Sequence, residues 1–107
     1  MGGWFVCRGR KLMFFEVLLN GKAFHLAGYR GRDELEDPLE GTLRERGLGE
    51  VTGGGGGEGV MNIDVEMSES LPLDRAADAL LAVLRELGAP PGTVVKSGNP
   101  GRKSWTV

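Results

Sequence analysis

The sequence predicts a single α+β domain in which two helices cover one face of an antiparallel sheet. Two observations carry this prediction. Residues 60–67 alternate between apolar and polar side chains, which is typical of a strand with one buried and one open face. Residues 74–87 place apolar side chains every three or four positions, which is typical of a helix that lies on a sheet. A chain of 107 residues fits one domain.

The first strand is predicted over residues 12–19, LMFFEVLL, which are apolar almost throughout. The Asn20-Gly21 pair follows, and this pair is favoured in two-residue hairpin turns. Residues 22–27 are therefore expected to return as an extra hairpin strand. We expect residues 1–12 to form a weakly ordered N-terminal extension, and the alternative is an edge strand over residues 4–7.

The first helix is predicted to begin at Pro38. Asp37 is a good N-cap, and Glu40 completes a capping box with it. An upstream start at Asp33 is the alternative. Gly47 supplies the left-handed residue that ends this helix.

The second helix is predicted to begin after an N-cap at Asp74 or Ser70 and to end at Gly88. The Pro-Pro-Gly sequence that follows cannot continue a helix. A short final strand is expected over residues 93–96. Residues 97–107 then form a loose C-terminal tail.

Two strands are predicted between the helices, over residues 48–52 and 60–67. Five consecutive glycines at 53–57 join them, and glycine costs more entropy to order than any other residue. We therefore expect a mobile hairpin link. The run lacks the lysine and the following helix that a phosphate-binding loop needs, so we do not expect a nucleotide site there.

The expected element order resembles the split ferredoxin-like pattern, β-α-β-β-α-β, with one extra N-terminal strand. Residues 13–96 would form this domain, with two helices on one face of the sheet and the other face open. The resemblance is one of element order. Because this fold hosts many functions, it implies none.

Charge is distributed unevenly along the chain. Residues 1–32 carry six basic groups and one acid, residues 33–74 carry twelve acids and two arginines, and residues 75–107 carry five basic groups and two acids. Such charges mostly keep a protein soluble. No stretch approaches the ~20 apolar residues that cross a membrane. With a single cysteine, Cys7, no internal disulfide can form, and a reducing, cytoplasmic location is the simplest expectation.

The sequence does not assemble a catalytic or metal-binding set. His25 is the only histidine and Cys7 the only cysteine, whereas a structural zinc site needs about four such ligands. Nothing orients the two as a nucleophilic pair. We therefore expect no enzyme, no cofactor and no metal, and His25 is interpreted as a surface or packing residue on the expected hairpin strand.

The polar side of residues 60–67 is the candidate interaction surface. Asn62, Asp64 and Glu66 share this side, and Glu16 would join them from a neighbouring strand. Trp105 is added because a fully exposed tryptophan near the end of the chain would be wasteful. A carboxylate cluster of this kind can also bind a cation or serve as an acid–base pair, or can simply be solvated.

Like charges on neighbouring strands are destabilising, so a positive group is expected beside these acids. Lys96, Arg102 and Lys103 are the candidates. The hypothesis is that the C-terminal tail crosses the open face and pairs with it.

These observations predict a small, non-enzymatic protein-interaction or regulatory module, either inhibitor-like or self-associating. It would use its open acidic face to bind a protein partner or a second copy of itself. The alternative is a small-molecule-sensing domain with its ligand near the glycine-rich hairpin or at a dimer interface. A less favoured alternative is a small enzyme that uses Asp64, Glu66 and His25. We do not expect a nucleic acid as partner, because the acidic face would repel phosphates. We do not expect a membrane either, because the chain has no apolar stretch of the required length.

Overall fold

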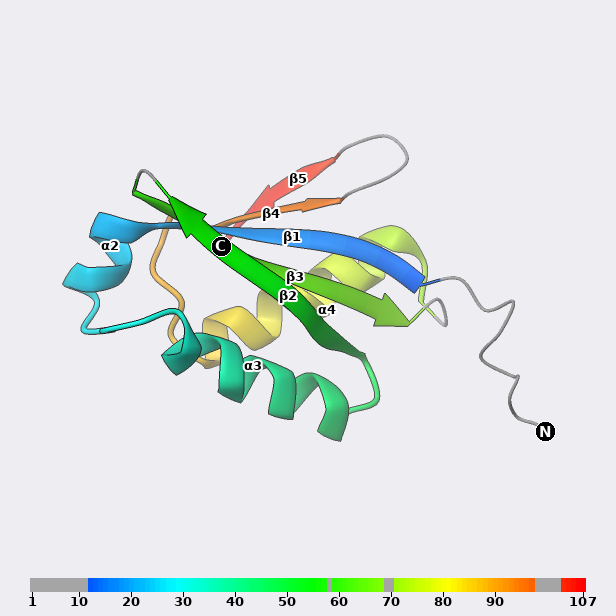
Figure 1. The fold of residues 1–107 in the computed structure, drawn as a ribbon. Helices are drawn as coiled ribbons and strands as arrows, with labels where there is room; N and C mark the ends of the chain where they lie inside the picture. Colours follow the sequence, from blue (N-terminus) through cyan, green and yellow to red (C-terminus); the bar gives the residue numbers. More distant parts are fainter. Residues whose placement is uncertain (1–11, 58, 69–70, 98–102) are drawn as a thin grey trace.

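The computed structural model describes residues 12–57, 59–68, 71–97 and 103–107. Its elements follow one another as shown in Figure 1. They are β1 (Leu12–Asn20), α2 (Gly21–Leu26), α3 (Asp33–Glu45), β2 (Gly49–Gly57), β3 (Val60–Ser68), α4 (Leu73–Glu86), β4 (Val94–Ser97) and β5 (Ser104–Thr106). No helix in these ranges is long and apolar enough to span a membrane.

The five strands form one antiparallel sheet in the order β2-β3-β1-β4-β5. Helices α3 and α4 lie against one side of it, and α2 lies at the end of the sheet, near the β2–β3 hairpin (Figure 1). The α+β class and the antiparallel sheet agree with the sequence prediction. The described chain has three helices rather than two.

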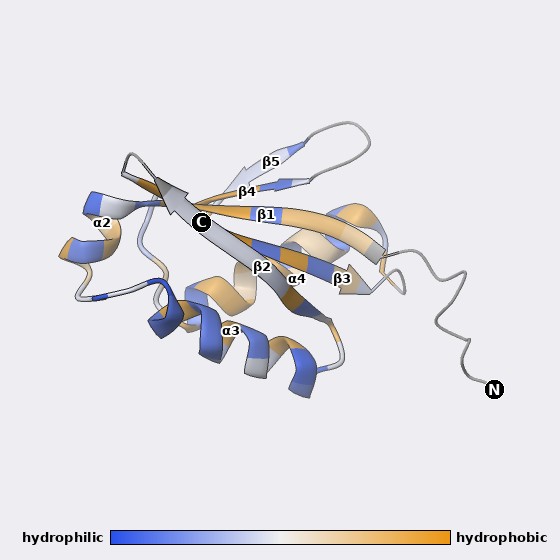
Figure 2. Cartoon of the chain, in the orientation of Figure 1, coloured by the Kyte–Doolittle hydropathy of each residue, from blue (hydrophilic) through white to orange (hydrophobic). Residues whose placement is uncertain are grey.

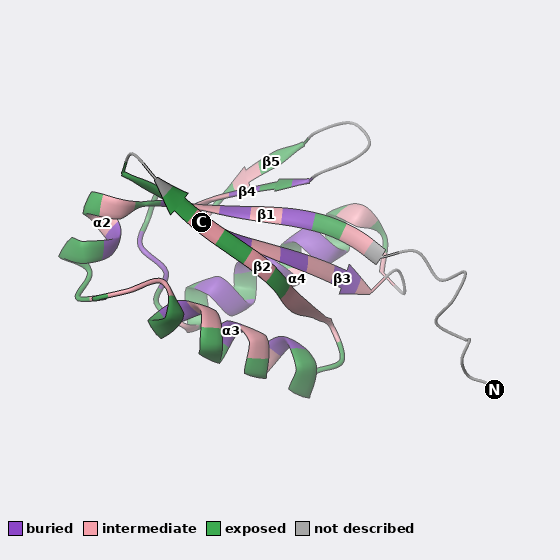
Figure 3. Ribbon diagram, in the orientation of Figure 1, coloured by how far each residue is buried: buried purple, intermediate pink, exposed green. Residues whose placement is uncertain are grey.

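The core lies between the sheet and helices α3 and α4. Alternate side chains of the two central strands point into it: Phe15, Val17, Leu19, Ile63, Val65 and Met67. Leucines of α3 and α4 meet them, and these hydrophobic stripes are visible in Figure 2. Figure 3 shows the same alternation of buried and half-buried residues along β1 and β3. The alternation predicted for residues 60–67 is thus confirmed.

The extra hairpin strand predicted over residues 22–27 is wrong, because these residues belong mainly to helix α2. The Asn20 side chain accepts a hydrogen bond from the backbone N–H of Ala23, at 3.0 Å, and so caps this helix. The Asn20-Gly21 pair therefore starts a helix instead of making a hairpin turn. The backbone N–H of Gly21 donates to the carbonyl of Gly59, at 2.7 Å, which ties the start of α2 to the β2–β3 hairpin.

The mobile link predicted for the glycine run is also wrong, because residues 53–57 lie in strand β2 and pair with β3. Strand pairing uses backbone N–H and C=O groups, which glycine supplies as fully as any other residue except proline. A bulge between Val51 and Gly53 shifts the register of this pairing. The glycine run is therefore a sheet edge without side chains.

Helix α3 begins at Asp33, as in the alternative prediction, and Asp37 is not its N-cap. The earlier start adds Leu35 to the buried face, and burying one leucine contributes about 1.5–3 kcal/mol. This burial offsets the hydrogen bond that Pro38, which lies inside the helix, cannot donate. Gly47, at φ 67°, follows the end of the helix as predicted.

Helix α4 begins at Leu73, with Pro72 as its N-cap and no side-chain cap. Asp74 therefore lies in the first turn instead of capping the helix, and its charge faces the positive end of the helix dipole. The other predicted cap, Ser70, lies outside the described residues. Gly88, at φ 84°, lies just beyond the end of the helix as predicted.

An ion pair joins the C-terminal ends of α3 and α4. Two nitrogens of Arg46 donate to the two carboxylate oxygens of Glu86, at 2.7 and 3.2 Å. These hydrogen bonds, together with the positive charge, lower the pKa of the Glu86 carboxyl below its usual value. They also raise the pKa of Arg46.

The C-terminal part of the chain extends the sheet. Strand β4 covers Val94–Ser97, one residue later than predicted, and β5 pairs with it. Residues 104–106 of the expected loose tail are thus part of the sheet. The predicted N-terminal extension, residues 1–12, falls outside the described residues except for Leu12, where β1 begins.

Candidate functional site

The open face of the sheet carries an acidic row that crosses its central strands. Glu16 on β1 lies opposite Asp64 on β3 and, on its other side, opposite Lys96 on β4. Antiparallel partners share one face, so these three side chains project from the side opposite α3 and α4. Glu16 and Asp64 are half-buried and Lys96 is exposed.

A second pair of acids lies beside this row. Glu66 on β3 lies opposite Glu50 on the edge strand β2, and on its other side it lies opposite Phe14. Arg44 of α3 reaches Glu50 at 3.2 Å, so Glu50 has a counter-charge at the sheet edge. Phe14, 37% exposed, gives the face an apolar patch next to the acids.

The central acids have few partners of their own. Within the described ranges, neither Glu16 nor Asp64 nor Glu66 forms an ion pair. Asp64 accepts one hydrogen bond from the amide of Asn62, at 3.0 Å, which holds these two side chains together. Within the described residues, the carboxylates of Glu16 and Glu66 thus have no ion-pair partner.

The glycine run of β2 forms the edge of this face and contributes no side chains to it. Gly53 lies opposite Asp64, and Gly55 lies opposite Asn62. A Cβ atom at either glycine would make only ordinary contacts, at 3.5 and 3.6 Å, with the side chains of these partners. Asp64 and Asn62 therefore have no neighbouring side chain at these two positions of β2.

The structure brings four of the five predicted surface residues together and separates the fifth. Asn62, Asp64, Glu66 and Glu16 lie on neighbouring strands of the open face. Trp105 instead belongs to β5, and its ring lies 6.0 Å from the ring of Phe15, which is a core residue. Trp105 is half-buried against the core, so it is not part of the acidic face.

The hypothesis that the tail crosses the open face and neutralises it is wrong for Lys103. Its ammonium group lies 3.6 Å from the carboxylate of Asp74 in the first turn of α4, away from the acidic face. Arg102 lies outside the described residues. Of the two basic candidates that the structure describes, Lys96 lies on the face and Lys103 does not.

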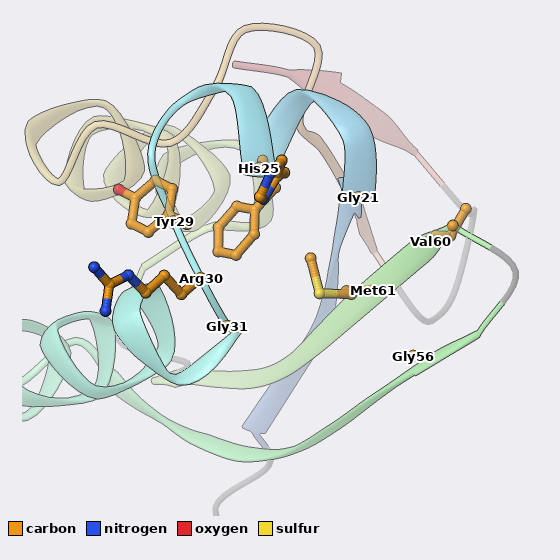
Figure 4. Close-up of a pocket in the computed structure, with 10 residues that line it drawn as sticks. Gly21, His25, Tyr29, Arg30, Gly31, Gly56, Val60 and Met61 are labelled. Atoms are coloured by element: carbon orange, nitrogen blue, oxygen red, sulfur yellow. The ribbon is translucent and has the colours of Figure 1, made fainter.

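A pocket of about 380 Å³ lies away from this face, between α2, the segment that follows it and the β2–β3 hairpin. His25 lines it from α2, where it is exposed, and not from the hairpin strand on which the sequence placed it. Figure 4 shows Met61 projecting from β3 toward α2, with Arg30 and Gly31 on one side and Gly56 on the other. Its full lining is Gly21, Phe24, His25, Tyr29, Arg30, Gly31, Gly56, Gly59, Val60 and Met61.

The alternative prediction placed a ligand near the glycine-rich hairpin, and this pocket lies beside that hairpin. Its lining from α2 could not be predicted, because it depends on the contact between Gly21 and Gly59, which are distant in the sequence. The one available signal was the glycine run itself, because glycine within a strand often marks the close approach of a ligand or of another backbone.

Within the described ranges, no group of three or more His, Cys, Asp or Glu side chains is arranged to hold a metal ion. Cys7, the other half of the rejected thiol–imidazole pair, lies outside these ranges. In comparisons with known proteins, the chain matches no family model, and no curated protein and no solved structure matches it at a significant level.

Proposed function

We propose that this protein is a non-enzymatic interaction module of ferredoxin-like fold that binds a basic protein partner through its open acidic sheet face. The fold assignment is supported by how the helices connect the strands. β1 and β2, joined through α3, are separated in the sheet by β3, and β3 and β4, joined through α4, are separated by β1. This is the connection of a split β-α-β unit, with α2 and β5 as additions.

The observation that carries the binding proposal is the placement of acids opposite acids on the open face, where Glu50 is paired with Arg44 but the other three acids form no ion pair within the described residues. Glu16 lies opposite Asp64, and Glu50 lies opposite Glu66. Like charges directly opposite each other on neighbouring strands reduce the stability of a sheet. A basic partner would relieve this repulsion on binding. This relief would make the free energy of binding more favourable.

The charge of the face also selects among partners. A second copy docked through the same face would bring carboxylates against carboxylates, which is unfavourable. A nucleic acid would meet the same repulsion through its phosphates. A protein with lysine or arginine side chains in an extended segment would meet complementary charge, and the apolar patch around Phe14 would add contact area.

The test is the affinity of the protein for an extended basic peptide of alternating lysine and valine, measured by fluorescence anisotropy. The triple variant Glu16→Gln, Asp64→Asn, Glu66→Gln removes the charge of the face. The matched control Asp37→Asn, Glu45→Gln, Asp78→Asn removes the same number of charges from exposed positions on the helices.

We expect the face variant to lose affinity by about tenfold or more, because close charge pairs at interfaces are worth roughly 1.5 kcal/mol or more each. The helix variant should bind as the unmodified protein does. Equal losses in the two variants would mean that net charge alone attracts the peptide, and the proposed site would be wrong.

A further inference from the structure

We propose that the pocket beneath the β2–β3 hairpin binds a small carboxylate that carries an aromatic or branched apolar group. This site is independent of the acidic face, because it lies on the side of the sheet toward which Met61 and the core residues of β3 point. Its volume, about 380 Å³, is within the range of about 300–1,000 Å³ that is typical of ligand pockets.

The apolar part of the site is held in place before any ligand arrives. The rings of Phe24 and Tyr29 stack face to face, with centroids 4.3 Å apart and planes 3° from parallel. The Tyr29 hydroxyl donates to the carbonyl of Leu87, at 2.8 Å, which anchors this stack to the end of α4. Val60 and Met61 complete the apolar lining, so an aromatic or branched group would meet a preformed surface.

One wall of the pocket depends on the glycine run. Gly56 lines the pocket, and a Cβ atom there would lie 3.3 Å from Cγ of Met61, which also lines it. A larger side chain at this position would occupy the space beside Met61. The missing side chain therefore keeps the pocket open and gives the run of glycines in β2 a physical role beyond strand pairing.

The contact that closes one end of the pocket is also specific to glycine. The backbone N–H of Gly21 donates to the carbonyl of Gly59, at 2.7 Å. A Cβ atom on Gly21 would lie 2.9 Å from that carbonyl oxygen, closer than side chains normally come. Gly59 has a φ of 81°, which favours glycine in its turn. These two residues fix the hairpin against α2.

The anionic part of the ligand is inferred from the polar groups in the lining. In Figure 4 the guanidinium of Arg30 extends away from Met61, and a ligand would bind it after the exposed side chain turns toward the pocket. Within the described residues this guanidinium has no ion-pair partner that would hold it elsewhere. The nearby carboxylate of Glu34 accepts instead from the backbone N–H of Arg30, at 2.9 Å. A guanidinium binds carboxylates with paired hydrogen bonds, and the His25 ring adds a second donor to the lining.

The experiment uses phenylacetate as the probe and 2-phenylacetamide as its uncharged counterpart, followed by the methyl resonances of Val60 and Met61 in ¹H–¹³C spectra. We expect saturable shifts with phenylacetate and at least about tenfold weaker binding of the amide, because the amide cannot pair with Arg30 as an anion does. Arg30→Gln should remove this preference, whereas Arg75→Gln, an exposed arginine on α4, should not change it.

Gly56→Val should fill the pocket and abolish the shifts of the Met61 methyl. Its matched control is Gly55→Val on the same strand, whose side chain points to the open face and should leave phenylacetate binding unchanged. The proposal would be overturned by phenylacetate binding that survives Gly56→Val, by equal affinity for the acid and the amide, or by the absence of saturable shifts in the unmodified protein. The comparison of acid with amide and the search for saturable shifts both use the unmodified protein, so they do not depend on the folding of a variant.

Discussion

Glu16 lies directly opposite Asp64 across the β1–β3 pair, on the face of the sheet away from the core. Lys96 lies on the other side of Glu16, and the described residues supply no other basic group to this row. The protein thus keeps an acid–acid pair at the centre of an open surface. This relationship leads to the first prediction and to the proposed function.

The first prediction concerns the repulsion between these two carboxylates. Asp64→Asn removes one charge and keeps an oxygen that can accept from Asn62. We expect a gain of about 0.2–1 kcal/mol in the free energy of unfolding, the range for cross-strand pairs. Urea denaturation measures this change. A loss of more than about 1 kcal/mol in the free energy of unfolding would instead indicate that Asp64 belongs to a stabilising network. The variant Lys96→Gln removes the cation beside Glu16 and should destabilise the protein.

The second prediction separates neighbouring glycines of β2. Gly55→Ala should stabilise the protein by about 0.5–1 kcal/mol, because alanine costs less entropy to order and its Cβ has room on the open face. Gly54→Ala should be destabilising, because its Cβ would lie 2.7 Å from the backbone carbonyl oxygen of Asn62. Midpoints of urea denaturation compare the two variants. The same sign for both would contradict the observed path of β2.

The third prediction concerns Trp105, which packs against Phe15 in the core. Trp105→Ala should destabilise the protein by about 1–3 kcal/mol, somewhat less than a fully buried aromatic residue because Trp105 is only half-buried. Trp105→Phe should lose less. Both variants should bind the basic peptide with unchanged affinity below their melting temperatures. A loss of affinity in a folded variant would indicate that Trp105 belongs to the interaction surface.

The fourth prediction concerns pH and the ion pair between Arg46 and Glu86. Because the pKa of Glu86 is lower in the folded protein than in the unfolded chain, the pair contributes stability above the unfolded pKa. This contribution should be lost as the pH falls through the lowered folded pKa. A double-mutant cycle with Arg46→Ala and Glu86→Ala, repeated at neutral and at acid pH, measures it.

We expect a small favourable coupling at neutral pH, since the pair is exposed to solvent, and none at acid pH. A coupling that persists after Glu86 has been protonated would contradict the prediction. Glu40→Ala is a control outside this pair, because Glu40 binds Arg44 and not Arg46.

The sequence predicted those parts of the fold that are set by local side-chain pattern. The alternation over residues 60–67 correctly separated Ile63, Val65 and Met67, which are buried, from Asn62, Asp64 and Glu66. This local pattern therefore identified most of the acidic face. The apolar spacing of α4 and the glycines that end both long helices were equally local signals.

The errors arose where one residue type suits two structures. Asn20 followed by Gly21 suits a tight hairpin turn, but the same Asn side chain can cap a helix, and the contact between Gly21 and Gly59 accompanies the second outcome. Glycine carries no side-chain pattern, so the pairing of Gly53 with Asp64 could not be read from the run itself. Pairing partners and the pocket both depend on contacts distant in the sequence.

The most direct test of the central claim is where a basic partner binds. A ¹H–¹⁵N titration of the labelled protein with the lysine–valine peptide would map the contact residue by residue. The acidic-face proposal predicts the largest shifts at Glu16, Asp64 and Glu66, and little change on the outward sides of α3 and α4. Shifts that concentrate on the helices, or that are spread evenly over the surface, would contradict it.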